Sequence, residues 1–464
     1  MELYILDSLL RRTAVIDRFE SMIWTERYSA WGDFELVIFS TLESRTLLKA
    51  GTRLAMSESY RVMTCEFVEN NIDSEGRQLL TVKGRSLEAI LDDRTARNTF
   101  ADLATTPKWV LTGTPGAIAR QIFNEICRTN VNFADDEIPF LQSGSIFPAS
   151  NIPEPADVIT IELSLSSVYT AIKELCDSYD LGFRLVRNFD ESELFFDIYS
   201  GSDRTTLQNV LAPVVFSPSL DNLTNTSEIT SISAYKNVAY VFHTVGVQIV
   251  TADVVSVEVE GFERRVMHVD ATDIEIPERG YSLAQSQNDA INAALNLVGI
   301  TDTEKAAMNN LRDKKRLTPA QVTATSTVGW GLISAAQRTE ILNARDVSVA
   351  YNATENAYVN PLLVQRGKEE LAKNRSLSAF DGELSQHSVY KYNTGYNLGD
   401  LVEMRNTDGV TNQMRVTEQI FVSDSEGERS YPTLTIDLFI TPGSWFAWDF
   451  NQVWADADGT WTEA

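Results

Sequence analysis

The chain opens with short hydrophobic runs that alternate with polar residues and are separated by turn residues. This period-2 pattern is typical of β-strands that bury one face. The predicted strands are Leu3–Leu6, Ala14–Ile16, Glu35–Phe39, Arg53–Met56, Arg61–Val68 and Leu79–Lys83, with a hairpin turn at Asp73–Gly76. Strands at this spacing predict a closed or nearly closed β-barrel over residues 1–100. Ser86 is then expected to cap a helix from Leu87 to about Asp93, with Glu88 in its first turn.

The hydrophobic spacing changes to that of helices over residues 101–210. Thr114 and Pro115 form a helix start. Two apolar helix faces are expected, one at Ile118, Ile122 and Ile126 and one at Val168, Ile172, Leu175 and Tyr179. Phe183–Val186 and Leu194–Tyr199 then predict a hairpin. The region is therefore expected to be an α+β domain.

Residues 211–280 return to the strand pattern, with runs at Val238–Phe242, Val245–Val250 and Val254–Val259. Residues 281–365 predict a helical insert, because an apolar stripe ends at Gly299 and Thr318-Pro319 is a helix start. Arg312, Lys314, Lys315 and Arg316 are the only basic cluster there, and a solvated helix end is favoured over a nucleic-acid patch.

Strand patterns complete a second barrel over residues 366–440. The expected strands are Leu398–Met404, Met414–Val422 and Thr433–Ile440, with a hairpin loop at Asp424–Gly427. The fold class predicted from the pattern is α+β and β-rich, with two β-barrel domains, an α+β domain and a helical insert. At 464 residues the chain is long enough for three or four domains.

Charge narrows the classes of partner. The net charge is −26, and residues 131–200 hold 13 acidic residues against three basic ones. Because DNA affinity depends on phosphates neutralised by Lys and Arg, the chain should repel nucleic acid. The acidic excess provides either a solvated surface or a wall that DNA passes without binding.

No residue pattern indicates catalysis, a cofactor or a metal. The catalytic and nucleotide-binding motifs G-x-S-x-G, H-E-x-x-H, G-x-G-x-x-G and the P-loop are absent. The odd number of cysteines (Cys65, Cys127 and Cys176) predicts buried thiols, and the three isolated histidines (His243, His268 and His387) do not predict a zinc site. Asp456–Gly459 has only part of the spacing of a calcium loop. We therefore expect no enzyme activity.

Three motifs resemble parts of siphophage tail-tip or baseplate hub proteins, also called tail-associated proteins. The first is Trp24–Tyr28 with Gly32–Ile38, and the second is the turn at Gly84–Leu91. The third is the Leu-Gly-Asp-Leu-Val run within Leu398–Met404, which follows Tyr390, Tyr392 and Tyr396. The resemblance extends to about residue 440 and is weakest over residues 101–210 and 281–365.

The resemblance implies a structural virion protein. It implies a homotrimer whose two barrels per subunit form a ring, which joins the six-fold tail tube to the three-fold tip and surrounds the DNA path. The implied partners are the distal tail ring protein, the tape-measure protein and a tip fibre or receptor-binding protein, while duplex DNA passes unbound. By the same resemblance Trp24, Tyr28, Phe34 and Arg85 are expected to be packing or interface residues.

The expected location is the virion tail tip after assembly in the host cytoplasm. The N-terminus lacks the pattern of a signal peptide, and no apolar run approaches the ~20 residues that span a bilayer. The alternative from another class is a carbohydrate-binding or glycan-degrading tail-tip protein. That function needs a cleft with aromatic residues beside two suitably spaced carboxylates, and no local pair identifies one.

Residues 441–464 form an acidic, aromatic C-terminal tail. Trp445, Trp448, Trp454 and Trp461 lie there, and no Lys or Arg follows Arg429. Exposed aromatic residues would form an adhesive patch, so we expect them to be covered. Two alternatives stay open: an extra strand that closes the last barrel, or a docking segment for the next tip component.

Overall fold

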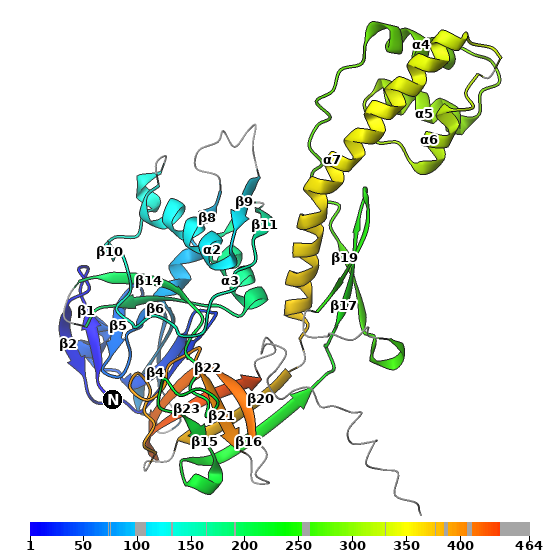
Figure 1. Cartoon of the computed structure of the whole chain (residues 1–464). Helices are drawn as coiled ribbons and strands as arrows, with labels where there is room; N and C mark the ends of the chain where they lie inside the picture. Colours follow the sequence, from blue (N-terminus) through cyan, green and yellow to red (C-terminus); the bar gives the residue numbers. More distant parts are fainter. Residues whose placement is uncertain are drawn as a thin grey trace, which may run out of the picture. The chain divides into compact units, whose positions relative to one another are not determined.

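The computed structural model describes residues 1–72, 74, 76–97, 108–130, 133–163, 165–189, 192–252, 260–329, 331–375, 377–384, 388–405 and 411–436. The chain divides into two compact units, and Figure 1 labels many of their helices and strands. Unit 1 combines Met1–Val238, Thr251–Arg265 and Glu369–Ala464, and unit 2 combines Ala239–Val250 and Val266–Lys368. Each unit therefore brings together segments that are distant in the sequence.

A 13-stranded sheet forms the frame of unit 1. Its strands are β1 (Leu3–Leu6), β2 (Arg12–Ile16), β3 (Ser21–Arg27), β4 (Asp33–Phe39), β5 (Arg53–Met56), β6 (Val62–Ile72), β7 (Gln78–Ser86), β15 (Val215–Phe216), β16 (Leu223–Ser231), β20 (Leu377–Leu384), β21 (Leu401–Arg405), β22 (Thr411–Asp424) and β23 (Gly427–Ile436). The hydrogen-bonded order is β16-β20-β23-β22-β3-β4-β7-β6-β5-β1-β2, and β21 pairs with both β22 and β15.

The alternating pattern places one face of these strands in a core. In β4, for example, Phe34 and Leu36 are buried while the residues between them are partly exposed. The strands predicted at Leu3–Leu6 and Arg53–Met56 have those bounds. The pattern did not predict β3, because buried Thr25 and Glu26 interrupt its alternation.

The mixed α+β, strand-rich class is confirmed, but the predicted closed barrels are not found in the described part of the chain. The main sheet is an open path, and β3 pairs directly with β22. Strands from the start and the end of the chain therefore belong to one continuous sheet. The sequence pattern specifies strands but not their partners, so it could not reveal this pairing.

Helices and short strands complete the first half of unit 1. They are α1 (Leu42–Leu47), the 3-10 helix η1 (Leu87–Leu91), β8 (Thr95–Ala96), β9 (Trp109–Gly113), α2 (Pro115–Phe123), the π-helix η2 (Asn124–Arg128), the 3-10 helix η3 (Ala134–Asp136), β10 (Leu141–Gln142), β11 (Ile159–Leu163), β12 (Ser166–Ser167), α3 (Val168–Tyr179), β13 (Gly182–Arg187) and β14 (Leu194–Tyr199). Two further 3-10 helices of unit 1 are η4 (Pro218–Leu220) and η5 (Gly261–Glu263).

The predicted helix faces on α2 and α3 are confirmed. Ile118, Ile122 and Ile126 are buried in the same core as Val168, Ile172 and Leu175, while Tyr179 packs against it from a partly buried position. The Thr114 side chain accepts a hydrogen bond from the backbone N–H of Ala117, as a helix cap does. The predicted hairpin is the antiparallel pair β13 and β14.

The structure corrects the predicted role of Ser86. The segment after it is a 3-10 helix of five residues, and the Ser86 hydroxyl makes no cap hydrogen bond to it. Instead Ser86 Oγ accepts from the backbone N–H of Gly32 at 2.7 Å. Glu88 lies in the first turn as predicted, but its side chain is fully buried. Both side chains connect distant segments.

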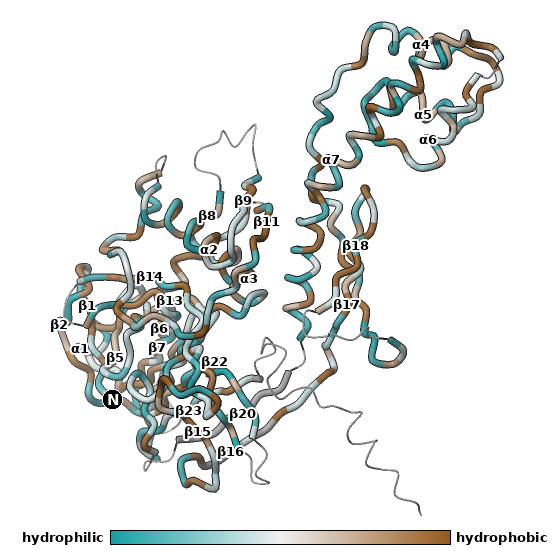
Figure 2. Tube along the Cα trace, viewed as in Figure 1, coloured by the Kyte–Doolittle hydropathy of each residue, from teal (hydrophilic) through white to brown (hydrophobic). Residues whose placement is uncertain are grey.

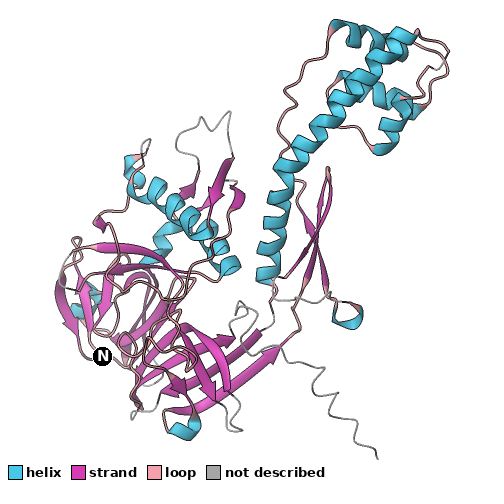
Figure 3. Ribbon diagram, in the orientation of Figure 1, coloured by secondary structure: helices cyan, strands magenta, loops and turns pink. Residues whose placement is uncertain are grey.

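Unit 2 consists of helices and one small sheet, as Figure 3 shows. The sheet has the order β18 (Gly246–Thr251), β17 (Val238–His243) and β19 (Val266–Asp270). The helices are α4 (Gln285–Leu295), α5 (Asp302–Arg312), α6 (Pro319–Thr325) and α7 (Ala335–Lys373), the last of which continues into unit 1. Thr318 caps α6 as predicted. A core of Ala, Ile, Leu, Met and Val side chains lies between these helices.

The three cysteines are buried free thiols, in agreement with the sequence analysis. Burial raises the pKa of the Cys65 and Cys127 thiols to about 12, which keeps them protonated at neutral pH. Hydrophobic and hydrophilic positions are interleaved along the chain in Figure 2. Among the described residues no helix has the length and apolarity needed to span a bilayer.

Some predicted features lie outside the described residues. They are the strand at 254–259, the end of the last strand at 437–440, the partial calcium loop at 456–459, His387, and the tail with Trp445, Trp448, Trp454 and Trp461. Part of the turn at 73–76 also lies outside them, but the flanking strands β6 and β7 pair from Ile72 and Gln78 onward.

Candidate functional site

The junction of β3 and β22 joins the first and last β-rich regions of unit 1. Its register runs from Glu418 opposite Arg27 to Ser423 opposite Met22. The Arg27 side chain lies between two carboxylates, those of Glu418 on β22 and Asp33 on β4. An ion pair thus reinforces the backbone hydrogen bonds where the two regions meet.

Tyr28 follows β3 and connects the sheet to the α+β region. Its hydroxyl is 3.0 Å from the carbonyl oxygen of Asp180 and 3.1 Å from that of Tyr199, to which it donates. A side chain at Gly182 or Gly399 would collide with the Tyr28 ring, because the added Cβ would lie 2.1 Å or 2.4 Å from ring carbon Cε2. Complete burial raises the Tyr28 pKa well above its ordinary value.

Buried charged side chains lie near the contacts that Tyr28 makes with the α+β region. Arg61 forms an ion pair with Glu88, and both side chains are almost inaccessible to solvent. A Glu88 carboxylate oxygen accepts from the backbone N–H of Leu185 at 2.9 Å. Because a buried charge is costly unless it is paired, this contact fixes the 3-10 helix η1 against β13.

A second carboxylate, Glu26, lies inside the same junction. It accepts from Trp24 Nε1 at 3.2 Å, from the Ser59 hydroxyl and from the Tyr392 hydroxyl at 2.8 Å. Burial, together with the negative charge of Glu26, raises the Tyr392 pKa well above its ordinary value. Glu26 therefore connects the first β-rich region to the tyrosine-rich segment before β21.

Arg415 and Asp400 form a third set of contacts. Arg415 donates to the carbonyl oxygens of Ser200 at 2.8 Å and Gly399 at 2.6 Å, and it is 2.9 Å from the Asp180 carboxylate. Asp400 accepts from Arg204 Nε at 2.8 Å and from the backbone N–H of Ser202 at 2.9 Å. These contacts hold the segment after β14 against the last β-rich region.

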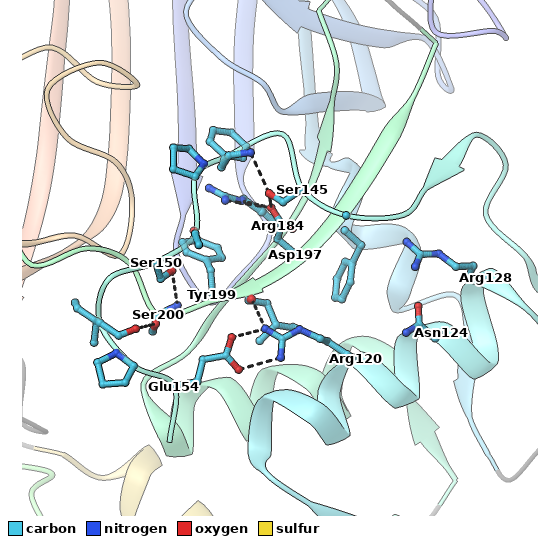
Figure 4. Close-up of a pocket in the computed structure, with 18 residues that line it drawn as sticks. Arg120, Asn124, Arg128, Ser145, Ser150, Glu154, Arg184, Asp197, Tyr199 and Ser200 are labelled. Atoms are coloured by element: carbon cyan, nitrogen blue, oxygen red, sulfur yellow. Dashed lines mark hydrogen bonds and ion pairs between the residues drawn. The ribbon is translucent and has the colours of Figure 1, made fainter. Parts of the chain in front are cut away.

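A cavity of about 490 Å³ lies in the α+β region of unit 1, between α2, its π-helical extension and β14. Figure 4 shows its lining side chains, which also come from the loop before β11. The lining residues are Arg120, Asn124, Arg128, Gly144, Ser145, Phe147, Pro148, Ala149, Ser150, Ile152, Pro153, Glu154, Arg184, Phe196, Asp197, Ile198, Tyr199 and Ser200. The lining of the cavity therefore contains both polar and aromatic side chains.

Two of the three arginines in this cavity are paired with carboxylates. Arg120 binds Glu154 through two nitrogens and also donates to the carbonyl oxygen of Ile198 at 2.8 Å. Arg184 is 3.1 Å from Asp197, and its guanidinium lies 3.6 Å from the centroid of the Phe147 ring. These interactions fix both arginines in place.

Arg128 differs from the other two arginines. It donates to the carbonyl oxygen of Gln142 at 2.7 Å, but it has no carboxylate partner among the described residues. Its Nε is buried without a hydrogen-bond partner in the same part of the chain. In Figure 4 it lies apart from the ion pairs, beside Asn124.

The cavity has the composition that a glycan-degrading function would need, with aromatic rings beside Glu154 and Asp197. However, each carboxylate already accepts hydrogen bonds from an arginine, so neither is available as a proton donor. Within the described residues no group of three or more His, Cys, Asp or Glu side chains could hold a metal ion.

The structure places the described members of the predicted packing and interface set as follows. Trp24, Tyr28 and Phe34 are buried inside unit 1. Arg85 lies at the surface, where it binds Glu66 at 2.9 Å and stacks over the Trp31 ring at 4.7 Å. A surface hollow of about 400 Å³ contains Arg85, the exposed Phe67 and the exposed Ile23.

The sequence pattern did not predict the buried charges of the junction or the arginines of the cavity. Arg120, Asn124 and Arg128 recur at four-residue intervals, which is the same period as the apolar stripe of α2. That polar stripe was the available signal for the cavity. The sequence contains no comparable signal for Arg61 and Glu88, because their pairing joins the residue before β6 to η1 through the fold.

Comparison with known proteins gives one family match. The family model described as Siphovirus ReqiPepy6 Gp37-like protein matches residues 2–434. None of the curated proteins matches the chain.

Similar solved structures include the tail protein from Neisseria meningitidis MC58, which has 10% identity and a TM-score of 0.45, with 94% of this chain and 96% of that chain covered. The 43 kDa tail protein of prophage MuSo2 from Shewanella oneidensis has 12% identity and a TM-score of 0.45, with 94% and 98% covered. The prophage tail protein gp18 from Listeria monocytogenes EGD-e has 11% identity and a TM-score of 0.41, with 95% and 96% covered.

Proposed function

The chain belongs to the Siphovirus ReqiPepy6 Gp37-like family of phage tail proteins, and we propose that it is the hub of a siphophage tail tip or baseplate. In this role it is a structural component of the virion. The match indicates no enzyme family.

The observation that carries this proposal is the β3–β22 junction. It binds two β-rich regions of one chain edge to edge in a continuous sheet, with buried ion pairs and tyrosines beside it. A chain built in this way presents two β-rich regions as a fixed pair. Three copies would supply six such regions, which is the number needed to continue a six-fold tail tube above a three-fold tip.

We propose that three chains form a ring around the DNA path. The net charge of −26 supports this role, because a carboxylate-rich lumen would not retain the phosphate backbone. In this proposal the ring contacts the distal tail ring protein and the tape-measure protein on one side. On the other side it contacts a tip fibre or receptor-binding protein. It assembles in the host cytoplasm and resides at the virion tail tip.

The surface around Arg85 supplies a candidate subunit interface. Phe67 is 50% exposed and Ile23 is 43% exposed, and both lie in the hollow that contains Arg85. Exposed apolar side chains beside a charged group are typical of protein interfaces. Trp24, Tyr28 and Phe34 would support this surface from inside the subunit.

Counting the copies of the chain in purified virions by quantitative mass spectrometry tests the proposal. We expect three copies per particle, with roughly 2,000 Å² or more buried per subunit contact, as in obligate assemblies. Any other copy number contradicts the ring. The substitution Phe67→Glu should prevent ring assembly without unfolding the subunit, whereas Leu42→Glu, at a residue 78% exposed elsewhere on unit 1, should not.

A carbohydrate-binding or glycan-degrading tail-tip protein is the second candidate. One observation favours it, namely the aromatic rings beside Glu154 and Asp197 in the cavity. The arginine ion pairs on both carboxylates weigh against hydrolysis. The hub is therefore the function that we propose.

A further inference from the structure

The cavity beside α2 carries a positive charge in a strongly acidic chain. Its lining includes three arginines and two carboxylates, so its charged side chains sum to +1 in a chain of net charge −26. Arg120 and Arg184 use their charge on Glu154 and Asp197. Arg128 thus supplies the excess positive charge that faces the cavity.

The π-helix η2 contributes Arg128 to this wall. The α-helix ends at Phe123, and the wider π turn from Asn124 to Arg128 carries the polar stripe onward beside the cavity. Single π turns inside helices are frequent at functional sites. A guanidinium offers a fork of donors that matches a carboxylate. A ligand with a carboxylate group would therefore complete the hydrogen bonding of Arg128.

Aromatic groups form the rest of the wall. Phe196 and Tyr199 lie on β14, and Phe147 lies on the loop that faces it. The Phe123 and Phe196 rings stack at 3.6 Å, which holds the Phe196 ring in place beside the cavity. A ligand that combines aromatic rings with carboxylates could pack against these aromatic side chains and also bind Arg128.

One segment of this chain has that composition. Residues 437–464 contain Trp445, Trp448, Trp454 and Trp461 with the acidic residues Asp437, Asp449, Asp456, Asp458 and Glu463, and they contain no Lys or Arg. Their charge is opposite to that of the cavity.

The last described strand ends close to the cavity. Thr435 of β23 is paired with Arg415 of β22, and the Arg415 side chain donates to the carbonyl oxygen of Ser200 at 2.8 Å. Ser200 itself lines the cavity. The 28 residues after Ile436 could extend roughly 90 Å, which is far more than this separation requires.

From this charge, composition and reach, we propose that the cavity is a peptide-binding site whose ligand is the acidic, aromatic segment 437–464 of this chain. Arg128 binds one of its carboxylates, and the aromatic wall receives a tryptophan. This role differs from both alternatives in the sequence analysis, an added strand and a docking segment for another tip protein. It does not depend on the proposed hub function.

Photo-crosslinking of the full-length chain tests the site directly. p-Benzoylphenylalanine replaces Trp448, the purified protein is irradiated, and crosslinked peptides are mapped by mass spectrometry. We expect crosslinks to residues that line the cavity, within 120–154 and 184–200. Crosslinks confined to β20–β23 would indicate an added strand and overturn the proposal, and so would crosslinks formed only when another tail protein is present.

Substitutions test whether the segment binds through the charge of Arg128 or merely lies close to the cavity. Arg128→Gln should lower the crosslink yield roughly fivefold or more, because a charge-assisted hydrogen bond is lost. The matched control is Arg312→Gln, which also removes an arginine from the last turn of a helical segment and should leave the yield unchanged. Equal yields in the wild type and Arg128→Gln would overturn the proposal.

Substitutions in the segment 437–464 itself test the same interaction without changing any residue of the cavity. Asp449→Asn, Asp456→Asn, Asp458→Asn and Glu463→Gln together leave the cavity intact and should reduce the yield by a similar factor. Raising the salt concentration should weaken the wild-type crosslink more than that of this variant. The yield is read independently of the copy number in virions, so failure of this site and failure of the hub proposal are distinguishable.

Discussion

Gly84 of β7 occupies a position where the backbone leaves no room for a side chain. A Cβ there would lie 1.8 Å from the carbonyl oxygen of Thr64 and 2.9 Å from the Phe34 ring. The register between β6 and β7 shifts just beyond this point, between Cys65 and Phe67. The glycine thus allows the strands to approach closely at an irregularity in the sheet.

Gly84→Ala should lower the free energy of unfolding by about 3 kcal/mol or more, because the clash is with backbone that cannot move independently. The matched control is Gly113→Ala in β9, where the nearest atom to the added Cβ is 3.5 Å away. We expect a change within about 0.5 kcal/mol for the control. Urea unfolding of both variants measures the difference, and similar losses would contradict the steric account.

At the residue scale, the sequence predicted groups whose partners are local. Thr114 caps its helix because the bonded N–H is three residues away. Ser86 was assigned a similar role, but its hydroxyl binds Gly32, which is 54 residues distant. Glu88 and Arg61 likewise meet only through the fold. A sequence pattern has no means of predicting such long-range pairs.

The long helix α7 of unit 2 is held by a buried ionic cluster. Arg279 binds Glu355 at 2.6 Å and donates to the Ser348 hydroxyl at 2.8 Å, while Arg316 is 3.0 Å from the second oxygen of Glu355. The Glu355 side chain is only 4% exposed. One carboxylate therefore binds two arginines, both of which precede α7 in the sequence.

Glu355→Ala should destabilise unit 2 by about 3–5 kcal/mol, because it leaves two arginines without their buried partner. Asp346→Ala on the same helix removes an exposed pair with Arg345 and should cost less than about 1 kcal/mol. Hydrogen exchange of backbone amides in α4–α7 measures both effects. Equal protection in the two variants would contradict a structural role for the cluster.

At the element scale, a helix could be predicted where its apolar residues recur regularly along one face. α2 and α3 have uninterrupted apolar faces, and both were predicted from them. α7 was not predicted as a separate helix within the insert 281–365, because its apolar residues are spread around the helix and Pro361 interrupts them. The cavity was also missed, since its wall combines a helix, a loop and a strand.

At the scale of the whole molecule, many of the acidic residues that give the chain its negative charge are paired with basic side chains. Among the described acidic residues of 131–200, at least seven form ion pairs: Asp136, Glu154, Glu162, Glu174, Asp177, Asp180 and Asp197. Much of this region therefore acts in internal bonding. Of the basic cluster in the insert, Arg312 pairs with Asp313 and Arg316 with Glu355.

The purified assembly should not bind duplex DNA. We expect no shift of a labelled duplex at low micromolar protein and 50 mM salt, because carboxylates and phosphates repel each other and a net charge of −26 releases few counterions. An electrophoretic mobility assay measures this, with a basic DNA-binding protein as the positive control. Tight, salt-sensitive binding would count against an acidic DNA path.

The β3–β22 junction also determines when the main sheet can finish folding, because β22 is synthesised long after β3. Arg27 and Glu418, which pair across it, are 391 residues apart in the chain. At the ~5–20 residues per second of protein synthesis, β3 waits ~20–80 s for its neighbour to leave the ribosome. During that interval one strand edge at the centre of the future sheet is unprotected against other nascent chains. We therefore expect the edge of β3 to be most exposed to pairing with other chains during synthesis.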